Sequence, residues 1–431
     1  GMKIMGLDGS YSESMEELFN NRRRIIQGEY LIRVKRIIDR VREDGDEALT
    51  EFTQIYDGVR LSAGDLRVDP EEIKKAYETV SEDFLQALRI ARDNISRFHS
   101  RQLERSWFDQ KSGILLGQMV SPLDSVGIYV PGGTACYPSS VLMNAIPAKV
   151  AGVRRIAMIT PPGREDILPE VLVAAAEAGV DEIYRVGGAQ GIAALAYGTN
   201  AIPRVDKVVG PGNIYVALAK RLVFGDVGVD MVAGPSEVLI IADDGANPAF
   251  IAADMLAQAE HDAMACCMLV TDSERIIAEV EAELRKQLKK LPREETARQS
   301  LEDYGALVLV GDMQEACELA NSIAPEHLGL MVREPLALLG KVRNAGAVFL
   351  GDYSPEALGD YLAGPNHVLP TGGTARFASP LGVEQFVKKT GLVYYTRDAL
   401  KKVSGDIAVL AEAEGLCAHR WAVELRCRKD D

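Results

Sequence analysis

A glutamate and a histidine stand side by side in the stretch APEHLGL, as Glu326 and His327. Adjacent side chains point to opposite faces of a strand and diverge by about 100° on a helix, so neither regular structure aims both at one bond. Pro325, whose φ angle is preset, and Gly329 together predict a turn here, and a turn can direct the two side chains to different sides of one cavity. The pair is therefore a candidate for acid–base chemistry, with an ordinary solvated loop as the alternative.

A second group of residues has the donor types of a metal site. Gln258 and His261, in AQAEHDA, are three residues apart and so share one face of a predicted helix. Two further ligands are needed, and Asp360 and His419 offer the nitrogen and oxygen donors that zinc or a neighbouring divalent ion takes. The residues alone do not bring these four positions together, so an ordinary core or surface histidine at position 261 stays open.

Four glycine-containing turns each follow a strand-like run: VPGGTACYPSS, VGGAQG, GPGN and AGPSE. Their backbone N–H groups, and those of the helices that follow, suit phosphate or another polar ligand. None matches G-x-G-x-x-G followed by an acid about 20 residues later, so the standard dinucleotide fingerprint is absent. Because open parallel sheets bind ligands at strand ends, the four turns still favour a nucleotide-like site, without naming the cofactor.

The hydrophobic pattern predicts the elements that must position these groups. The first hundred residues are expected to be helical, with Asp69 and Ser81 as N-caps of two helices. From about residue 125 to about 352, short apolar runs alternate with glycine turns and helical stretches, which predicts an α/β fold of parallel sheets with flanking helices. Residues 364–382 have the composition of a loop, and a mostly helical tail is expected after them.

The overall composition narrows the class of protein. The chain has 431 residues, 47% of them hydrophobic and 26% charged, which is ordinary for globular proteins with more than one core. Its net charge of −15 argues against a nucleic-acid or anionic-membrane partner. No apolar run approaches the roughly 18 residues of a spanning helix, the N-terminus lacks a signal-peptide layout, and the cysteines form no C-x-x-C pair. We expect a cytoplasmic enzyme or binding protein with reduced thiols.

Seven blocks of the sequence resemble those that define the histidinol dehydrogenase family: GIYVPGGTACYPSSVLMNAIPAKVAGV, VGGAQGIAALAYGT, VVGPGN, AGPSEVLIIAD, AQAEHD, APEHLGL and LGDYLAGPNHVLPTGGTARF. The resemblance is collinear from about residue 30 to the end. It implies an NAD-dependent zinc enzyme that oxidises L-histidinol to L-histidinal and then, through the aldehyde hydrate, to L-histidine, the last step of histidine biosynthesis. The implied fold has two incomplete Rossmann-like domains, with helical N- and C-terminal arms exchanged across a homodimer.

The resemblance also implies roles for individual residues. Those implied to bind one zinc ion per subunit, and with it the substrate, are Gln258, His261, Asp360 and His419. The implied acid–base pair is Glu326 and His327, of which His327 also contacts the substrate. Further implied substrate contacts are Ser236, His367 and Glu414, and the implied NAD contacts are Tyr129, Gln190 and Asn213. Glu414 and His419 are expected to reach the site from the partner subunit.

The expected domain borders accompany this assignment. A helical arm spans residues 1–25, and the first Rossmann-like domain comprises residues 26–122 and 236–381. Residues 123–235 form the second, NAD-binding domain, and residues 382–431 form a helical tail that reaches the partner subunit. In this tail, Gly415 and Trp421 differ from the residues expected beside the ligand histidine.

Two successive oxidations at one carbon explain why two bases stand together. The alcohol proton must leave as the hydride departs, which suits a histidine, and a water must attack the aldehyde, which suits an adjacent carboxylate. Three alternatives remain: a zinc-dependent hydrolase, a dehydrogenase of the same family for another amino alcohol, and a non-catalytic zinc-stabilised homodimer. A thiohemiacetal at Cys136 is a further alternative, although no neighbouring base or signature supports it.

Overall fold

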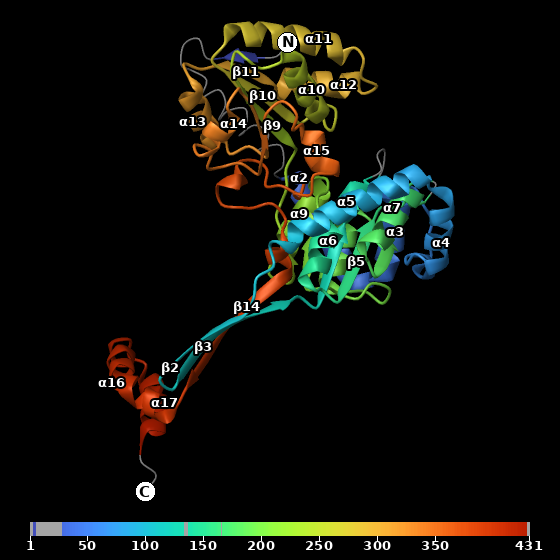
Figure 1. Cartoon of the computed structure of the whole chain (residues 1–431). Coiled ribbons are helices and arrows are strands. Elements are labelled where there is room, and N and C mark those ends of the chain that lie inside the picture. The colour runs from blue at the N-terminus through green and yellow to red at the C-terminus, as the bar shows by residue number, and fades with distance from the viewer. Residues whose placement is uncertain (1–2, 6–27, 133–136, 165, 429–431) are drawn as a thin grey trace. The chain divides into compact units, whose positions relative to one another are not determined.

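Two parallel sheets, with helices packed on them, make up most of the chain (Figure 1). The computed structural model describes residues 3–5, 28–132, 137–164 and 166–428. Cys136 and, apart from residues 3–5, the expected N-terminal arm lie outside the described residues. The predicted α/β class with parallel sheets and flanking helices is confirmed.

The six-stranded sheet has the strand order β1-β11-β10-β9-β12-β13, and all its neighbours are parallel. Its strands are β1 (Lys3–Met5), β9 (Glu237–Ala242), β10 (Cys266–Thr271), β11 (Ala306–Leu309), β12 (His327–Met331) and β13 (Ala347–Leu350). The helices between and after them are α10 (Pro248–Ala259), α11 (Glu274–Leu288), α12 (Glu294–Tyr304), α13 (Met313–Ile323), α14 (Pro335–Leu339) and α15 (Glu356–Tyr361). Strands β9, β10 and β12 are buried along their whole length, which is typical of a parallel sheet covered on both faces.

The five-stranded sheet has the order β6-β5-β4-β7-β8 and is also parallel throughout. Its strands are β4 (Ser125–Tyr129), β5 (Arg155–Thr160), β6 (Glu182–Arg185), β7 (Lys207–Val209) and β8 (Gly228–Val229). The helices that connect them are α6 (Pro138–Ala151), α7 (Pro169–Ala178), α8 (Gly188–Tyr197) and α9 (Ile214–Val223). Alternate residues of β5 enter two cores: Ile156 and Met158 pack with α6 and α7, whereas Ala157 and Ile159 pack with α8.

The N-terminal helices complete both cores of the five-stranded sheet. They are α2 (Glu29–Asp44), α3 (Asp46–Asp57), α4 (Pro70–Thr79) and α5 (Glu82–Ser100), with a 3₁₀ turn, η1 (Ala63–Asp65), between α3 and α4. Helices α2 and α3 pack with α8 and α9, and α4 and α5 pack with α6 and α7. These contacts are with the sheet of residues 125–229, whereas the sequence-based division grouped residues 26–122 with residues 236–381. The predicted caps are confirmed, since Asp69 and Ser81 accept hydrogen bonds from the first turns of α4 and α5.

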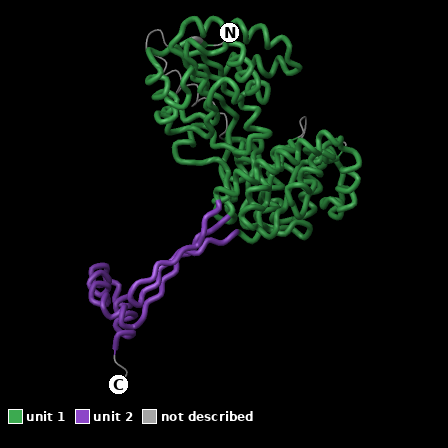
Figure 2. Tube along the Cα trace, viewed as in Figure 1, with its two compact units in different colours: residues 1–102, 123–386 green, residues 103–122, 387–431 purple. Residues whose placement is uncertain are grey.

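Residues 103–122 and 387–431 form a separate unit (Figure 2). It contains an antiparallel sheet of β2 (Trp107–Lys111), β3 (Ile114–Pro122) and β14 (Val387–Tyr395), followed by α16 (Arg397–Ala413) and α17 (Cys417–Cys427). The tail predicted to be mostly helical thus begins with the 3₁₀ turn η3 (Val383–Phe386) and a strand, and becomes helical from Arg397. Residues 364–382 carry no strand and only the turn η2 (Thr374–Arg376), as predicted for a loop. No helix among the described residues is long and apolar enough to cross a membrane.

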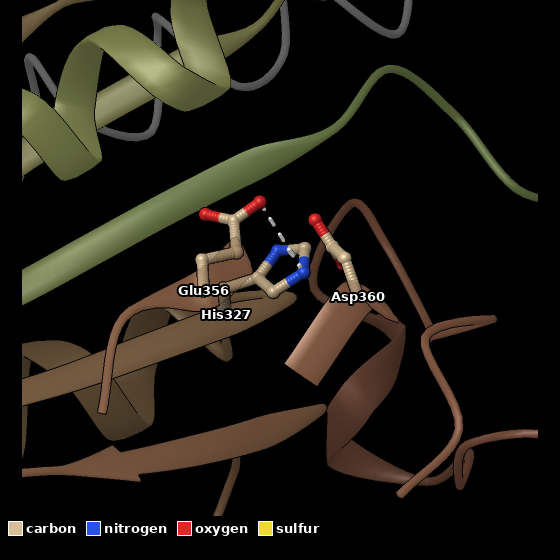
Figure 3. A group of neighbouring side chains, drawn as sticks. All are labelled: His327, Glu356 and Asp360. Atoms are coloured by element: carbon tan, nitrogen blue, oxygen red, sulfur yellow. Dashed lines mark ion pairs between the residues drawn. The ribbon is translucent and has the colours of Figure 1, made fainter. Parts of the chain in front are cut away.

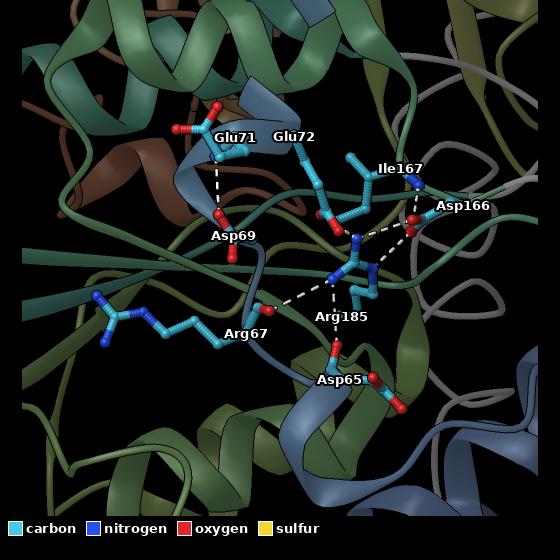
Figure 4. Close-up of polar contacts among 8 residues, drawn as sticks. All are labelled: Asp65, Arg67, Asp69, Glu71, Glu72, Asp166, Ile167 and Arg185. Atoms are coloured by element: carbon cyan, nitrogen blue, oxygen red, sulfur yellow. Dashed lines mark hydrogen bonds and ion pairs between the residues drawn. The ribbon is translucent and has the colours of Figure 1, made fainter. Parts of the chain in front are cut away.

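Arg185, at the end of β6, ties the segment before α4 to the five-stranded sheet (Figure 4). Its guanidinium donates to the carbonyl oxygens of Asp65 and Arg67, at 3.1 and 3.4 Å. It also makes two hydrogen bonds to the carboxylate of Asp166, at 2.7 and 2.8 Å, and pairs with Glu72. The Arg185 side chain is only 7% exposed, so these contacts replace most of the water that would otherwise solvate its charge.

Replacing Arg185 by methionine is expected to lower the midpoint of thermal unfolding. The acidic partners are themselves 50% and 42% exposed, so water screens the ion pairs and most of the loss comes from the carbonyls left without a donor. That loss corresponds to about 1–3 kcal/mol. Arg154→Met is the matched control, because Arg154 and its partner Asp124 are 83% and 70% exposed. Scanning calorimetry of both variants should show a lower midpoint for Arg185→Met alone, and equal midpoints would contradict the role given to Arg185.

Candidate active site

Glu326 and His327 lie where a helix leads into a central strand of the six-stranded sheet. Helix α13 is closed by Ala324 in the left-handed conformation, with φ at 52°, and β12 begins at His327. The predicted turn from Pro325 to Gly329 is therefore wrong: the chain reverses at Ala324, and Gly329 lies inside β12, paired with both β9 and β13. Glu326 and His327 thus lie at the amino edge of the sheet, where β12 is paired with β9 on one side and β13 on the other.

Glu237, the first residue of β9, orients both side chains and is itself fully buried. Its backbone N–H donates to Oε2 of Glu326 at 2.8 Å, and its carbonyl oxygen lies 3.0 Å from Nδ1 of His327. Its carboxylate oxygen Oε1 accepts from the backbone N–H groups of Glu326 and Gly372, at 3.2 and 3.1 Å. One buried residue therefore places the acid, the imidazole and the loop around Gly372.

The contacts of His327 decide which ring nitrogen faces the site. A carbonyl oxygen can only accept, so Nδ1 carries the proton that is donated to Glu237. Nε2 then points toward the carboxylate of Glu356, 3.5 Å away (Figure 3). Burial lowers the pKa of His327, but the charges of Glu356 and Glu326 outweigh burial and hold this pKa well above its usual value. Nε2 is therefore a nitrogen that readily takes up a proton.

His327, Glu356 and Asp360 form a metal-competent cluster, in which ligand atoms from the three side chains all lie within 4.8 Å of one another (Figure 3). The two acids are four residues apart in α15 and so project from one face of that helix. Burial raises the pKa of Glu356 to about 8. Because like charges repel strongly where water is excluded, a proton or a divalent cation stabilises such a cluster, and its nitrogen and oxygen donors suit zinc.

Two further side chains support the cluster. Gln258, in the last turn of α10, donates to Oε1 of Glu356 at 2.7 Å when its amide nitrogen is assigned to the side that faces the acid. His367 donates from Nδ1 to the carbonyl oxygen of Asp360 at 3.1 Å, and its Nε2 lies 3.5 Å from Oγ of Ser140. Burial lowers the pKa of His367, which favours its neutral form.

The remaining residues implied as ligands or substrate contacts are more exposed. Ser236 directly precedes β9 and is partly buried. His261 follows α10, its side chain is exposed, and its described hydrogen bonds are made by its backbone. Glu414 caps the end of α16 and His419 lies in α17, both exposed in the separate unit. Of the residues singled out from the sequence, those that the structure brings together here are Gln258, Glu326, His327, Asp360 and His367.

The residues implied to contact NAD lie at the carboxyl edge of the five-stranded sheet. Tyr129 ends β4, Gln190 lies in the first turn of α8 after β6, and Asn213 is the N-cap of α9 after β7. The chain runs from β4 outward to β6 and then returns to place β7 on the other side of β4, so the β4/β7 boundary is the topological switch point. Open α/β sheets bind ligands at such a point. Burial raises the pKa of Tyr129 to about 12, and its protonated hydroxyl accepts a hydrogen bond from the backbone of Gly188 at 3.2 Å.

Sequence reasoning missed Glu356 and Glu237. The spacing of Glu356 four residues before Asp360 was a usable signal, since it places two carboxylates on one helix face. Glu237 was signalled by an acid at the head of the otherwise apolar run EVLIIA, because a charge in such a strand needs specific partners. Neither signal says which distant residues those partners are.

The fold and the site together define a class of protein. Two Rossmann-like units carry, at one sheet edge, a ligand-binding switch point and, at another, a buried acid–base pair beside a metal-competent cluster. This combination is that of an α/β enzyme that carries out acid–base chemistry on a bound ligand.

Comparison with known proteins identifies the family. The family profile described as histidinol dehydrogenase matches residues 20–427. The chain is 56% identical over 410 residues to the histidinol dehydrogenase of Caldanaerobacter subterraneus subsp. tengcongensis, covering 95% of each protein. It is 53% identical over 433 residues to that of Listeria monocytogenes serovar 1/2a, covering all of both. A crystal structure of histidinol dehydrogenase from Elizabethkingia anophelis is 36% identical, with a TM-score of 0.91 over 99% of this chain and 98% of that one. The chain belongs to the histidinol dehydrogenase family.

Zinc affinities of two variants test which residues bind the metal: the ligands implied by the resemblance, which exclude His327, or the cluster of His327, Glu356 and Asp360. Asp360→Asn is expected to weaken zinc binding by at least the roughly 10- to 100-fold that loss of a supporting group costs, because Asp360 belongs to both sets. His327→Ala is expected to keep its zinc, since it removes a base and no implied ligand. Competition with a chromogenic chelator measures both affinities, and loss of zinc from His327→Ala would assign that imidazole to the metal. Asp244→Asn is the control, because this acid is 63% exposed and follows the carboxyl end of β9.

Proposed function

We propose that this protein catalyses the NAD-dependent, four-electron oxidation of L-histidinol through L-histidinal to L-histidine, the last step of histidine biosynthesis. Membership of the family supports both the substrate and the reaction. The observation that carries the proposal is the buried pair of Glu326 and His327, 5% and 4% exposed, beside metal-competent carboxylates. Acid–base groups held in this way suit a reaction that must remove protons at one carbon twice.

Zinc is the proposed metal, one ion per subunit, and Asp360 is the ligand common to the family's set and to the cluster described above. Gln258 and His261 of the same chain, with His419 of a second copy, complete the proposed set. When bound, zinc would hold the imidazole and amine of the substrate, and NAD would accept a hydride in each oxidation. The accumulation of buried carboxylates beside His327 supports a cation at this place.

His327 is the proposed base for the alcohol step. Its Nδ1 is committed to the carbonyl oxygen of Glu237, so Nε2 is the atom that takes the hydroxyl proton as the carbinol C–H bond breaks. The neighbouring carboxylates of Glu326 and Glu356 stabilise the imidazolium that results. The fixed ring orientation means that little reorganisation accompanies the transfer.

Glu326 is the proposed base for the aldehyde step. Its Oε2 accepts the backbone N–H of Glu237, which leaves Oε1 to take a proton from the water that attacks the aldehyde carbon. Because Oε2 of Glu326 lies 3.6 Å from Nδ1 of His327, the acid and the imidazole occupy two sides of one small region. This arrangement supports two successive oxidations without release of the aldehyde.

A homodimer is the proposed assembly. Glu414 and His419 are exposed in the separate unit, which suits residues that reach a site on a second copy of the chain. Ser236 and His367 of the first copy would complete the substrate contacts. Tyr129, Gln190 and Asn213 are the proposed NAD contacts, supported by their place at the switch point of the five-stranded sheet.

The yield of NADH per L-histidinol consumed tests the proposed function. We expect two NADH per substrate, lost when zinc is chelated and restored when it is returned, because each oxidation passes one hydride to NAD. Absorbance at the NADH band measures the NADH formed, and chromatography measures the L-histidinol consumed and the amino acid produced. One NADH with release of aldehyde would mean a simple alcohol dehydrogenase, and no NADH despite bound zinc would favour a zinc hydrolase.

Substituting Glu326 by glutamine separates the two half-reactions. The amide oxygen can still accept from the backbone of Glu237, so the local fold is kept while the base is lost. We expect oxidation of L-histidinal to fall by roughly 10²- to 10⁴-fold and oxidation of L-histidinol to fall less. Single-turnover NADH formation from each substrate measures the two rates, and equal losses would refute the division of labour between Glu326 and His327.

A further inference from the structure

Lys220 and Asp230 form an ion pair that is almost completely removed from water. Lys220 lies in α9 and Asp230 directly follows β8, and their side chains are 2% and 0% exposed. Nζ of Lys220 is 2.5 Å from Oδ1 of Asp230. Nothing in the proposed chemistry uses either residue, so the pair needs another explanation.

Both charged groups bind the backbone of the same residue, Gly210. Nζ of Lys220 donates to the carbonyl oxygen of Gly210 at 2.9 Å, and the N–H of Gly210 donates to Oδ2 of Asp230 at 3.1 Å. Gly210 has φ at +114°, and a Cβ built there would lie 2.3 Å from the carbonyl oxygen of Tyr129. The ion pair therefore holds a glycine whose backbone packs directly against the last residue of β4.

Gly210 opens the turn GPGN, which ends at Asn213, the N-cap of α9. Its neighbour Tyr129 accepts a hydrogen bond from the backbone of Gly188, at the start of α8. The ion pair is thus linked by direct contacts to the two strand ends that form the switch point. Of the proposed NAD contacts, Tyr129 and Asn213 lie at these two strand ends, and Gln190 lies in α8, whose first residue donates to Tyr129.

Stability alone is a weak reason for such a pair. Burying two charges costs so much solvation that well-packed apolar residues of similar volume are often equally or more stabilising. What charged groups add is direction, because each fixes the donor or acceptor that it binds. Here the groups that they fix are the N–H and the carbonyl of one residue at the mouth of a ligand site.

We propose that Lys220 and Asp230 are positioning residues of the dinucleotide site, which hold the Gly210–Asn213 turn against Tyr129 so that NAD meets a preformed surface. The inference rests on the proposed function, because it assumes that the switch point of the five-stranded sheet takes NAD. Neither side chain touches the cofactor in this proposal; both act through the backbone of Gly210.

The test is the affinity of the full-length, zinc-loaded enzyme for NADH, measured by fluorescence titration without histidinol. The variant is Lys220→Met with Asp230→Asn, which leaves no unpaired buried charge. We expect the Kd for NADH to rise at least roughly fivefold, the factor that one hydrogen bond of average strength contributes. In turnover, KM for NAD should rise while KM for histidinol and kcat at saturating NAD change little.

Arg155→Met with Glu182→Gln is the matched control. This second charge pair of the same sheet joins the first residues of β5 and β6, with side chains 24% and 15% exposed. The pair lies at the amino edge of the sheet, opposite Gly210. Its loss should lower the midpoint of thermal unfolding and leave the Kd for NADH unchanged.

The outcomes separate this inference from the proposed function. A wild-type enzyme that binds no NADH would refute the proposed function and this inference with it. A wild-type enzyme that binds NADH, with a double variant that is folded by circular dichroism and binds equally well, would refute the inference alone. Should the double variant not fold, Asp230→Glu keeps the charge opposite Lys220 but adds one methylene, which moves the acceptor away from the N–H of Gly210. We expect Asp230→Glu to raise the Kd for NADH by at least about threefold, and an unchanged Kd in this folded variant would overturn the inference.

Discussion

The candidate active site depends on the burial of Glu237 at the head of β9. A carboxylate with no exposure to water must be fully hydrogen-bonded, and this one accepts from the backbone at Glu326 and Gly372. The same residue's peptide groups hold the side chains of Glu326 and His327. Because the strand, the acid–base pair and the loop share these bonds, moving any one of them would leave buried polar groups unsatisfied. That constraint fixes the positions of Glu326 and His327, which suits the proton transfers proposed for them.

Electrostatics at the site follow from the same burial. Glu326, Glu356 and Asp360 surround one imidazole in a region from which water is largely excluded. Their charges raise the pKa of His327 against the effect of its burial, and burial raises the pKa of Glu356. A cluster of this kind carries excess negative charge unless protons or a cation occupy it. The capacity to hold a cation and the high proton affinity of His327 are thus two consequences of one arrangement.

The two sheets carry their candidate functional residues at opposite ends of the strands. In the five-stranded sheet, the residues that suit a dinucleotide lie at the carboxyl ends of the strands, beside the switch point of β4 and β7. In the six-stranded sheet, Glu237 and His327 stand at the amino ends of β9 and β12. Helix α10 follows β9 and returns toward this amino edge, which brings Gln258, in its last turn, to Glu356. The general rule for open sheets therefore accounts for the proposed cofactor edge but not for the proposed catalytic edge.

The sequence by itself was sufficient for features that depend on neighbouring residues or on long collinear blocks. It predicted the α/β class and the caps at Asp69 and Ser81, because the alternation of strand-like and helical runs and the capping residues can be recognised within short stretches. It predicted the family from the order of the longer blocks. It placed Glu326 and His327 in a turn, whereas the structure puts His327 at the start of a buried strand and Glu326 directly before it. Only the tertiary structure could decide that, because the pairing of β12 with β9, about 90 residues earlier, determines the conformation of the segment. The tertiary structure alone also decides what surrounds Glu237 and Glu356. The effect of a buried carboxylate depends on which distant groups share its low-dielectric surroundings, and the local sequence does not encode that proximity.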